Sequence, residues 1–569
     1  MATPSTVRQR PLAYIAALLV VVAIVVGIVV IVPNGAAEFP RLAVLPFENL
    51  GAEADEYVAD GITEAITTRL TAISQLRVVS RQSAIQYKNS QKSARQIAEE
   101  LNVEYLLTGT LQRERPSDPS SSVRIVPGLI RASDDTNLWG ATFDVDLTAL
   151  FQVFARIGEE IARQLDLTLL EPVRQTLATQ PTDNQEAYDF YLRGKGHFAR
   201  RVSEEDAFNA IQMFQRAVDL DTTFAEAYAA LSHARVFYAW DFDGEDELPQ
   251  AKAAIDKALA LAPDRSAVQI AAGFYSYYGA VEYEEALQRF EAVRRREPNN
   301  ADVINAVGLI NRRLGHWDEA LQSFVEASEL SPQDYFVAFL AAQTSAAMRQ
   351  YEQAERFYDR AMSIAPAVAD AHNEKAWLYV HWDGTTDRAW EVLQAASSTI
   401  DSSRLALTRM WLHVLDGDYQ SSQDLAPVAP VSEGADRARW FVPYLSGQQD
   451  LANAYADSAR IVYEAAVEAR PSEPQLHSYL GAAYAALALN DDAVREGREA
   501  VRLRPDAFTG PTLLWNLALI HVILGQLGPA LVQLETFASV PSRIDLPPLG
   551  LDPSWAPLRS LPRFQRLTR

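Results

Sequence analysis

The side chains that could do chemistry are scattered along this sequence and form no known catalytic pattern. Asp60 and Glu64 stand four residues apart, so they would share one face of a helix and could act as an acid–base pair. Two acids near the start of a helix more often interact with its dipole, and we assign them that role. Eight histidines occur without metal-ligand spacing: His197, His233, His316, His372, His381, His413, His477 and His521. We therefore expect no catalytic residue, no cofactor and no metal ion, and a protein that is not an enzyme.

Short catalytic motifs are missing from the sequence as well. It contains no GxxxxGK(S/T) phosphate-binding loop, no HExxH or GxSxG motif and no EF-hand loop. It has no cysteine, which excludes disulfides, cysteine-based zinc sites, iron–sulfur clusters and thiol catalysis. The net charge is −23, from 74 acidic and 51 basic residues, and an acidic surface repels phosphate backbones. We expect no nucleic-acid partner.

The larger elements of the chain must therefore create whatever binding surface it has. With 569 residues the chain is too long for one compact core, and roughly three or four domain-sized units are expected. Hydrophobic residues make up 48% and charged residues 22% of the chain, as in folded proteins.

One segment is apolar enough to cross a membrane. Residues 12–32 carry no charge over about 21 positions, and a helix of this length spans a hydrocarbon core of ~30 Å. Arg8 and Arg10 precede the segment, and residues 1–11 contain no acid. The positive-inside rule then places residues 1–11 in the cytoplasm and the bulk of the chain outside it. The alternative is a signal peptide cleaved near residues 35–37, which would also export the bulk of the chain.

Residues 38–170 alternate between strand and helix patterns. The predicted strands cover 41–47, 76–80, 103–114, 122–132 and 137–147, and the predicted helices cover 51–70, 93–102 and 151–169. Strands and helices that alternate, followed by antiparallel hairpins, imply a small α/β domain with a mixed sheet covered by helices.

The order of these elements resembles the TolB-amino-terminal/FlgO-like extracytoplasmic domain. The resemblance is carried by LAVLPFENL (42–50), YVADGITEAITTRL (57–70), LRVVSRQSAIQYK (76–88), IAEELNVEYLLTGTL (97–111) and LWGATFDVDL (138–147). It implies a domain outside a bacterial inner membrane, often followed by tetratricopeptide (TPR) repeats. Family members often carry a winged-helix, cyclase or kinase domain before the membrane span. Nothing of that kind precedes residue 12, so we expect neither a transcription regulator nor a receptor cyclase.

Residues 186–541 carry a spacing of 34 residues that resembles TPR helix pairs. The pattern occurs as Ala320, Phe324, Ala327, Pro332, as Ala354, Tyr358, Ala361, Pro366, and as Ala459, Tyr463, Ala466, Pro471, with looser copies elsewhere. Small residues fit where two helices cross closely, the bulky residue fills the gap between units, and proline ends the helix. We expect an all-α superhelical solenoid of about nine or ten units. A linker at 171–185 precedes it, and a C-terminal tail at 542–569 packs on it.

The resemblance to TPR proteins also implies a concave groove lined by the first helix of each unit. In this register the groove positions are Ile270, Phe274, Tyr277, Asn305, Leu309, Arg312, Phe339, Gln343, Asn373 and Trp377. We expect a partner protein or peptide to contact eight of them: Phe274, Tyr277, Asn305, Arg312, Phe339, Gln343, Asn373 and Trp377. The alternative is that some of the aromatic residues belong to the core between repeats.

These observations favour a membrane-tethered extracytoplasmic scaffold that binds other proteins through its TPR repeats. The alternative is a sensory or regulatory subunit, in which the α/β domain binds a ligand or envelope component and a partner carries the output. A hydrolase within the α/β domain is disfavoured because the motif search finds no catalytic pattern.

The membrane topology can be tested directly. A reporter that is active only outside the cytoplasm should be active when it is fused after Arg569, and activity of a cytoplasmic reporter alone would contradict the orientation. Removal of residues 1–33 should release a soluble, folded protein. Tight membrane association of that shorter chain would reveal a second anchor.

Overall fold

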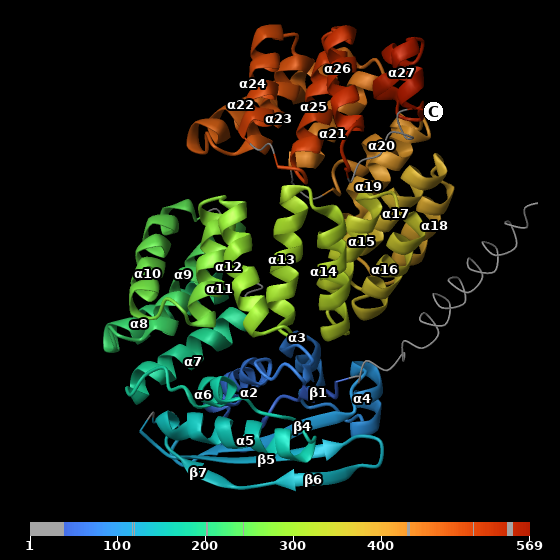
Figure 1. Ribbon diagram of the computed structural model, residues 1–569. Coiled ribbons are helices and arrows are strands. Elements are labelled where there is room, and N and C mark those ends of the chain that lie inside the picture. The colour runs from blue at the N-terminus through green and yellow to red at the C-terminus, as the bar shows by residue number, and fades with distance from the viewer. Residues whose placement is uncertain are drawn as a thin grey trace, which may run out of the picture. The chain divides into compact units, whose positions relative to one another are not determined.

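The structure is a computed structural model in which a small α/β region is followed by a long series of helices (Figure 1). It describes residues 39–568, except for 117, 119, 201–202, 243, 430–432, 504–505 and 543–549. The predicted cytoplasmic segment 1–11 and membrane segment 12–32 lie outside the described residues. Within the part of the chain that is described, no helix combines the length and the apolar character needed to span a membrane.

The α/β region is built on a mixed sheet. Its described strands are β1 Arg41–Val44, β2 Glu48–Asn49, β3 Arg77–Val78, β4 Tyr105–Arg113, β5 Val123–Arg131, β6 Thr136–Gly140 and β7 Phe143–Val145. The strand order is β3-β1-β4-β5-β6, with β2 beside β4 and β7 beside β5. β1 is parallel to β3 and β4, whereas β5 is antiparallel to β4, β6 and β7. The predicted mixed sheet is confirmed, although the run expected as one strand at 137–147 forms two short ones.

Helices cover both faces of this sheet. They are α2 Glu56–Leu70, α3 Arg81–Ala84, α4 Ala94–Leu101 and α5 Leu150–Gln164, and α6 Glu171–Ala178 packs on α2 and α5. Leu107 and Leu111 of β4 share one buried cluster with α2 and α5, whereas Leu106 lies in a second cluster with α4. Successive residues of a strand point to opposite faces of the sheet, so the apolar residues at 105–107 pack against helices on both faces.

Helices α7 to α26 follow as ten successive pairs within the described residues. Their bounds are α7 Gln185–Arg200, α8 Glu204–Leu220, α9 Ala225–Asp241, α10 Leu248–Leu261, α11 Ser266–Phe274, α12 Tyr283–Arg296, α13 Ala301–Leu314, α14 Trp317–Leu330, α15 Tyr335–Ala347, α16 Tyr351–Ile364, α17 Ala369–Asp383, α18 Asp387–Ala396, α19 Ser402–Leu415, α20 Tyr419–Leu425, α21 Glu433–Leu445, α22 Gln449–Ala469, α23 Pro474–Ala486, α24 Asn490–Leu503, α25 Gly510–Ile523 and α26 Leu527–Ala538. The helical solenoid predicted from the repeat spacing is therefore present, and the array is of the TPR type.

The bulky residues of the repeat pattern fill the core as expected. Phe290, Phe324, Tyr358 and Tyr463 are each no more than 3% exposed. The partner helix makes room for them: a Cβ atom at Gly308 of α13 would lie 2.7 Å from the ring of Phe324. A side chain at Gly308 would force the two helices of that pair apart, because packed cores have little free volume.

The core of the α/β region continues without a break into the first helices of the array. Tyr188 and Leu192 of α7 belong to the same buried cluster as the sheet residues. α7 approaches α2 so closely that a Cβ atom at Gly61 would lie 2.6 Å from Cδ2 of Leu192. The expected linker 171–185 contains α6, whose Leu177 is fully buried.

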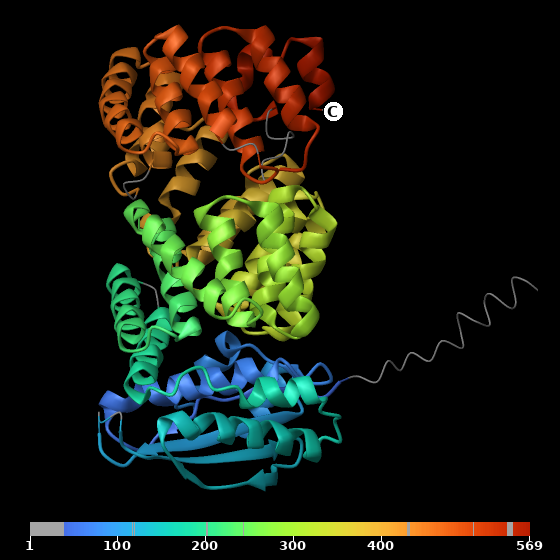
Figure 2. The same ribbon diagram turned by 60° about the vertical axis from the view of Figure 1, so that its left-hand side comes forward.

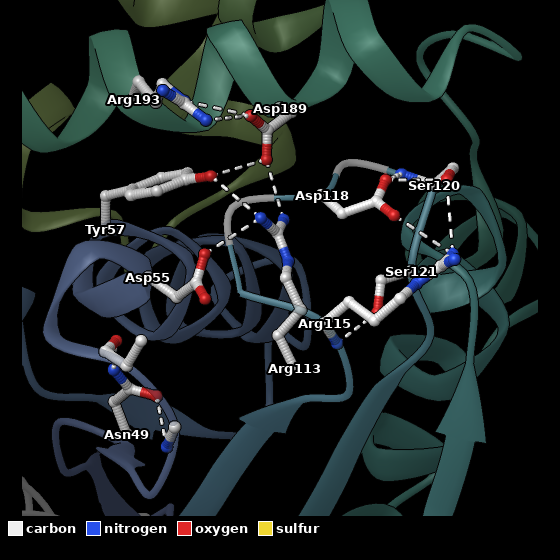
Figure 3. A network of polar contacts seen from close by, with 12 residues as sticks. Asn49, Asp55, Tyr57, Arg113, Arg115, Asp118, Ser120, Ser121, Asp189 and Arg193 are labelled. Carbon is white, nitrogen blue, oxygen red and sulfur yellow. Dashed lines mark hydrogen bonds and ion pairs between the residues drawn. The ribbon is translucent and has the colours of Figure 1, made fainter.

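A buried ion cluster crosses this junction (Figure 3). Arg113, at the end of β4, donates to Asp55 Oδ1 at 3.0 Å and to Asp189 Oδ1 of α7 at 2.7 Å. The side chains of Arg113 and Asp55 are fully buried and that of Asp189 is 2% exposed. The Tyr57 hydroxyl donates to Asp189 at 2.7 Å, and Arg193 donates to the other Asp189 oxygen at 2.9 Å. Burial and the nearby Asp189 charge raise the pKa of Tyr57 to about 12, so this phenol remains a donor.

The array returns to the α/β region at a second place (Figure 2). Asn299 Nδ2, just before α13, donates to the carbonyl of Leu76 at 2.9 Å. The backbone N–H of Ser80 donates to the carbonyl of Leu330, at the end of α14, at 2.9 Å. The loops of the α13/α14 pair are therefore tied to the loops on either side of β3.

The last described residues, 550–568, contain the 3₁₀ helix η7 Pro553–Leu558 and the helix α27 Pro562–Leu567. Trp555 is fully buried, and its ring centroid lies 4.8 Å from that of Trp515 in α25.

The Arg113 cluster predicts a large effect of a single substitution on stability. Arg113→Met leaves Asp55 and Asp189 buried without their shared cation, so the free energy of unfolding should fall by about 3–5 kcal/mol. Denaturant unfolding of the chain without residues 1–33 measures this. Arg124→Met is the matched control, because Arg124 on β5 pairs with Asp144 while both side chains are more than half exposed. The control should be close to wild type, and equal losses in the two variants would contradict the role of burial.

Candidate peptide-binding face

The eight predicted partner-binding residues lie on the first helices of four consecutive pairs, α11, α13, α15 and α17, and on η5 (Tyr275–Gly279), the π-helical turn after α11. We call these residues and their neighbours on the same helices the first-helix face. Tyr277, Arg312, Phe339 and Gln343 are less than one-tenth exposed. Phe274, Asn305, Asn373 and Trp377 are half-buried. The face is therefore more closed than the sequence suggested.

Phe274 of α11 and Tyr277 of η5 both contact other residues of their own chain. Phe274 stacks on His233 of the preceding pair, with ring centroids 4.3 Å apart, and contacts Phe290 edge-on at 5.0 Å. The hydroxyl of Tyr277 accepts a hydrogen bond from Arg313 Nε at 3.3 Å. Both rings pack between repeats, as the alternative interpretation of this face allowed.

Polar residues of the next three units form a continuous chain. Arg312 Nη1 of α13 lies 3.4 Å from Gln343 Oε1 of α15, and Gln343 Nε2 lies 3.5 Å from Glu374 Oε1 of α17. Each step covers 31 residues, which is one repeat minus about one helical turn. The chain therefore runs obliquely across three first helices and brings a cation, an amide and a carboxylate into line.

Two amide side chains flank this polar chain at repeat spacing. Asn305 in α13 and Asn373 in α17 stand at equivalent positions, with Phe339 of α15 between them. The Oδ1 atoms of both are buried and accept no hydrogen bond in the described structure. Asn373 uses its Nδ2 to bind the carbonyl of Arg404 at 3.2 Å. A buried acceptor without a donor costs free energy, so each of these oxygens is suited to an N–H group supplied by a ligand.

Trp377 lines a cavity of about 20 Å³ with Gln343, Tyr358, Glu374 and His381. A volume of this size holds about one water molecule. The ring of Phe339 is 6.1 Å from that of Tyr358 but is not part of the cavity wall. The small hollow beside Trp377 is thus lined by polar and apolar side chains alike.

A larger cavity, of about 480 Å³, lies between α18, α19 and α20. Its wall includes Trp390, Arg409, His413 and Asp424. The indole Nε1 of Trp390 donates to Asp416 at 2.8 Å, and Arg409 donates to Ser397 and to the carbonyl of Leu393. Trp390 and Arg409 are thus engaged by the chain itself, whereas the Oδ1 atoms of Asn305 and Asn373 are not.

Sequence reasoning missed three features of the first-helix face. Glu374 completes the polar chain, and a search for polar residues 31 positions apart would have found it. Phe336, one turn before Phe339, is 45% exposed, and its ring contacts that of Tyr335 edge-on at 6.3 Å. Arg313 follows Arg312 and contacts Asp506, from a loop that carries no repeat signal.

The guanidinium of Arg313 is a permanent cation on this face. Burial lowers its pKa, but the neighbouring Tyr277 and Asp506 outweigh burial and raise the pKa above the ordinary value for arginine. The positive charge of Arg313 on this face therefore does not change with pH in the range where proteins fold.

Comparison with known sequences gives a partial relative. No protein-family model matches this chain. Over 238 residues it is 29% identical to a protein of Rhizobium meliloti (strain 1021) named putative adenylate cyclase 3. The match covers 40% of this chain and 40% of that protein, so the chain spans well under half of its relative's length.

Among solved structures, PilF of Pseudomonas aeruginosa is 21% identical, with a TM-score of 0.31, over 42% of this chain and 97% of PilF. YrrB, described as a TPR protein with an unusual peptide-binding site, is 24% identical, with a TM-score of 0.25, over 33% of this chain and 91% of YrrB. The assignment of the array to the TPR type rests on the 34-residue spacing and the helix pairs of the chain itself.

Because the buried Oδ1 atom of Asn305 accepts no hydrogen bond, its removal should increase the stability of the free protein. Asn305→Leu replaces a buried acceptor by an apolar group of similar size, so the free protein should gain about 1 kcal/mol of unfolding free energy. Asn299→Leu is the matched control, because its amide donates to two carbonyls, and this variant should lose stability. Melting temperatures of the chain without residues 1–33 measure both. A less stable Asn305→Leu variant would show that the Asn305 oxygen is satisfied in solution.

Proposed function

We propose that this chain is a membrane-tethered, extracytoplasmic scaffold that holds a protein or peptide partner on its first-helix face. The observation that carries the proposal is the pair of buried amide oxygens of Asn305 and Asn373, which flank the polar chain at repeat spacing. Proteins rarely leave buried acceptors unpaired, and functional sites are among the places where they do so.

A partner in an extended conformation suits this face. Its backbone N–H groups would donate to Asn305 and Asn373, which lie two repeats apart. A side-chain carboxylate would bind at the Arg312/Arg313 end of the face, since guanidinium and carboxylate form a strong, charge-assisted pair. An apolar side chain would cover the exposed ring of Phe336.

The apolar segment 12–32 and the arginines before it support the proposed location. The chain would be held in a bacterial inner membrane by a single span, with residues 1–11 in the cytoplasm and the α/β region and array outside it. We assign no cofactor and no catalytic step to this scaffold.

A regulatory subunit is the second candidate, and the partial relative favours it. The Rhizobium meliloti protein is named as a putative adenylate cyclase, and the 238 matched residues are 40% of its length. In this alternative the α/β region senses a ligand or envelope component and the partner on the array carries the output.

Site-specific photo-crosslinking tests the scaffold. A photoreactive phenylalanine at Phe336 should give discrete protein adducts in native membranes, to be identified by mass spectrometry. The matched control is Phe208 on α8, which is 49% exposed against 45% for Phe336 but lies on a second helix. Adducts from position 336 but not from 208 support the proposal. Identical adducts from both positions, or none from 336, would contradict it.

A further inference from the structure

A short loop from the C-terminal part of the array lies against the end of α13. Residues 506–509 immediately precede α25, and the loop begins at Asp506, which pairs with Arg313 across 193 positions of sequence. Asp506 is only 8% exposed. A Cβ atom at Gly315, the residue after α13, would lie 3.2 Å from Cβ of Ala507, so loop and helix end are in close contact.

The backbone of the loop completes the C-terminal turn of α13. That helix ends at Leu314, and Gly315 has a left-handed conformation with φ of +82°. The last carbonyl groups of a helix have no donor within the helix. The N–H of Ala507 donates to the carbonyl of Arg313 at 2.9 Å. Any extended peptide could form this bond, because it does not involve the side chain of residue 507.

The side chains of the loop engage both arginines of the face. Arg313 donates to the Asp506 carboxylate at 3.3 Å and to the Thr509 hydroxyl. The guanidinium carbon of Arg312 lies 3.7 Å from the ring centroid of Phe508, a cation–π arrangement. The Asp506 carboxylate also accepts from the backbone N–H groups of Phe508 at 3.0 Å and Thr509 at 2.8 Å. One carboxylate thus shapes the loop and binds the helix.

The loop therefore occupies the basic end of the first-helix face. Arg312 is the first member of the polar chain that continues to Gln343, and Phe508 covers it. Four consecutive residues supply a backbone donor, a carboxylate and an aromatic ring, which is a set of contacts that a bound peptide can reproduce.

We propose that residues 506–509 are an internal ligand of this face, and that its partner is a peptide with an aspartate two residues before a phenylalanine. The inference rests on the proposed function and names the partner's chemistry. The partner forms the same contacts as the loop. Its carboxylate binds Arg313, its aromatic ring stacks on Arg312, and one of its backbone N–H groups donates to the carbonyl of Arg313. Because the loop is tethered, its effective concentration is high, and weak ligands are excluded from the free protein.

A peptide-binding experiment with the purified full chain tests this inference. The probe is a fluorescent peptide of residues 503–512, LRPDAFTGPT, followed by anisotropy. The opened variant carries Asp506→Ala and Phe508→Ala. Its Kd for the peptide should be at least tenfold lower than that of wild type, and addition of Arg312→Met should raise the Kd at least tenfold again. Phe208→Ala in place of the loop changes should leave the wild-type affinity.

Equal Kd values for the wild-type chain and the opened variant would overturn the inference. The photo-crosslinking adducts at Phe336 then separate the two claims. Adducts that persist leave the proposed function intact and remove only the internal ligand, whereas their absence counts against the proposed function itself.

A second measurement keeps the test valid if the opened variant does not fold. The chain has no cysteine, so Ala507→Cys introduces a single thiol on the loop. Excess peptide should raise the rate of maleimide labelling at this position at least fivefold, because the loop leaves α13. A labelling rate that does not respond to the peptide would overturn the inference.

Discussion

Arg113 joins the two halves of this molecule, and the geometry of its side chain explains why an arginine is needed there. A guanidinium presents five donors in a planar fork, so it can serve Asp55 on one side and Asp189 on the other, which the point charge of a lysine cannot do as well. All three side chains are at most 2% exposed, and a buried charge that loses its partner is strongly destabilising. The ion cluster therefore fixes α7 against the end of β4 to within hydrogen-bond tolerance. Each later helix pair packs on the one before it, so this junction sets the direction in which the array starts.

The array is held in place at more than its start. Asn299 and Leu330 tie the α13/α14 pair back to the loops around β3, and Asp506 ties the C-terminal part of the array to α13. A face built on such a frame loses little conformational entropy when a partner binds. The frame also explains how buried acceptors at Asn305 and Asn373 can be tolerated, because the packing of the repeats stabilises the fold around them.

The repeat architecture was predictable from the sequence because its signal is periodic. Small residues such as Ala327 and bulky ones such as Phe324 recur every 34 positions, and the structure buries both completely. The mixed sheet was predictable from alternating patterns in the same way. The Arg113–Asp189 pair was not, because a contact between two charges 76 residues apart leaves no periodic trace. The partner-binding positions came from a resemblance that gives side-chain direction but not burial, so it could not tell exposed Phe336 from buried Tyr277. The loop at 506–509 lies between repeats, so neither the 34-residue spacing nor the resemblance to TPR proteins predicts its position.

Native-state hydrogen exchange tests most directly whether the α/β region and the start of the array form one body through this ion cluster. Amides of β4 and α7 should exchange through the same opening event, with equal free energies and equal dependence on denaturant, because breaking the cluster exposes both. In an Asp189→Asn variant both sets of amides should lose protection together. If the amides of α7 exchange through a separate, lower-energy opening while those of β4 keep their full protection, the two halves are independent and the cluster does not set the direction of the array.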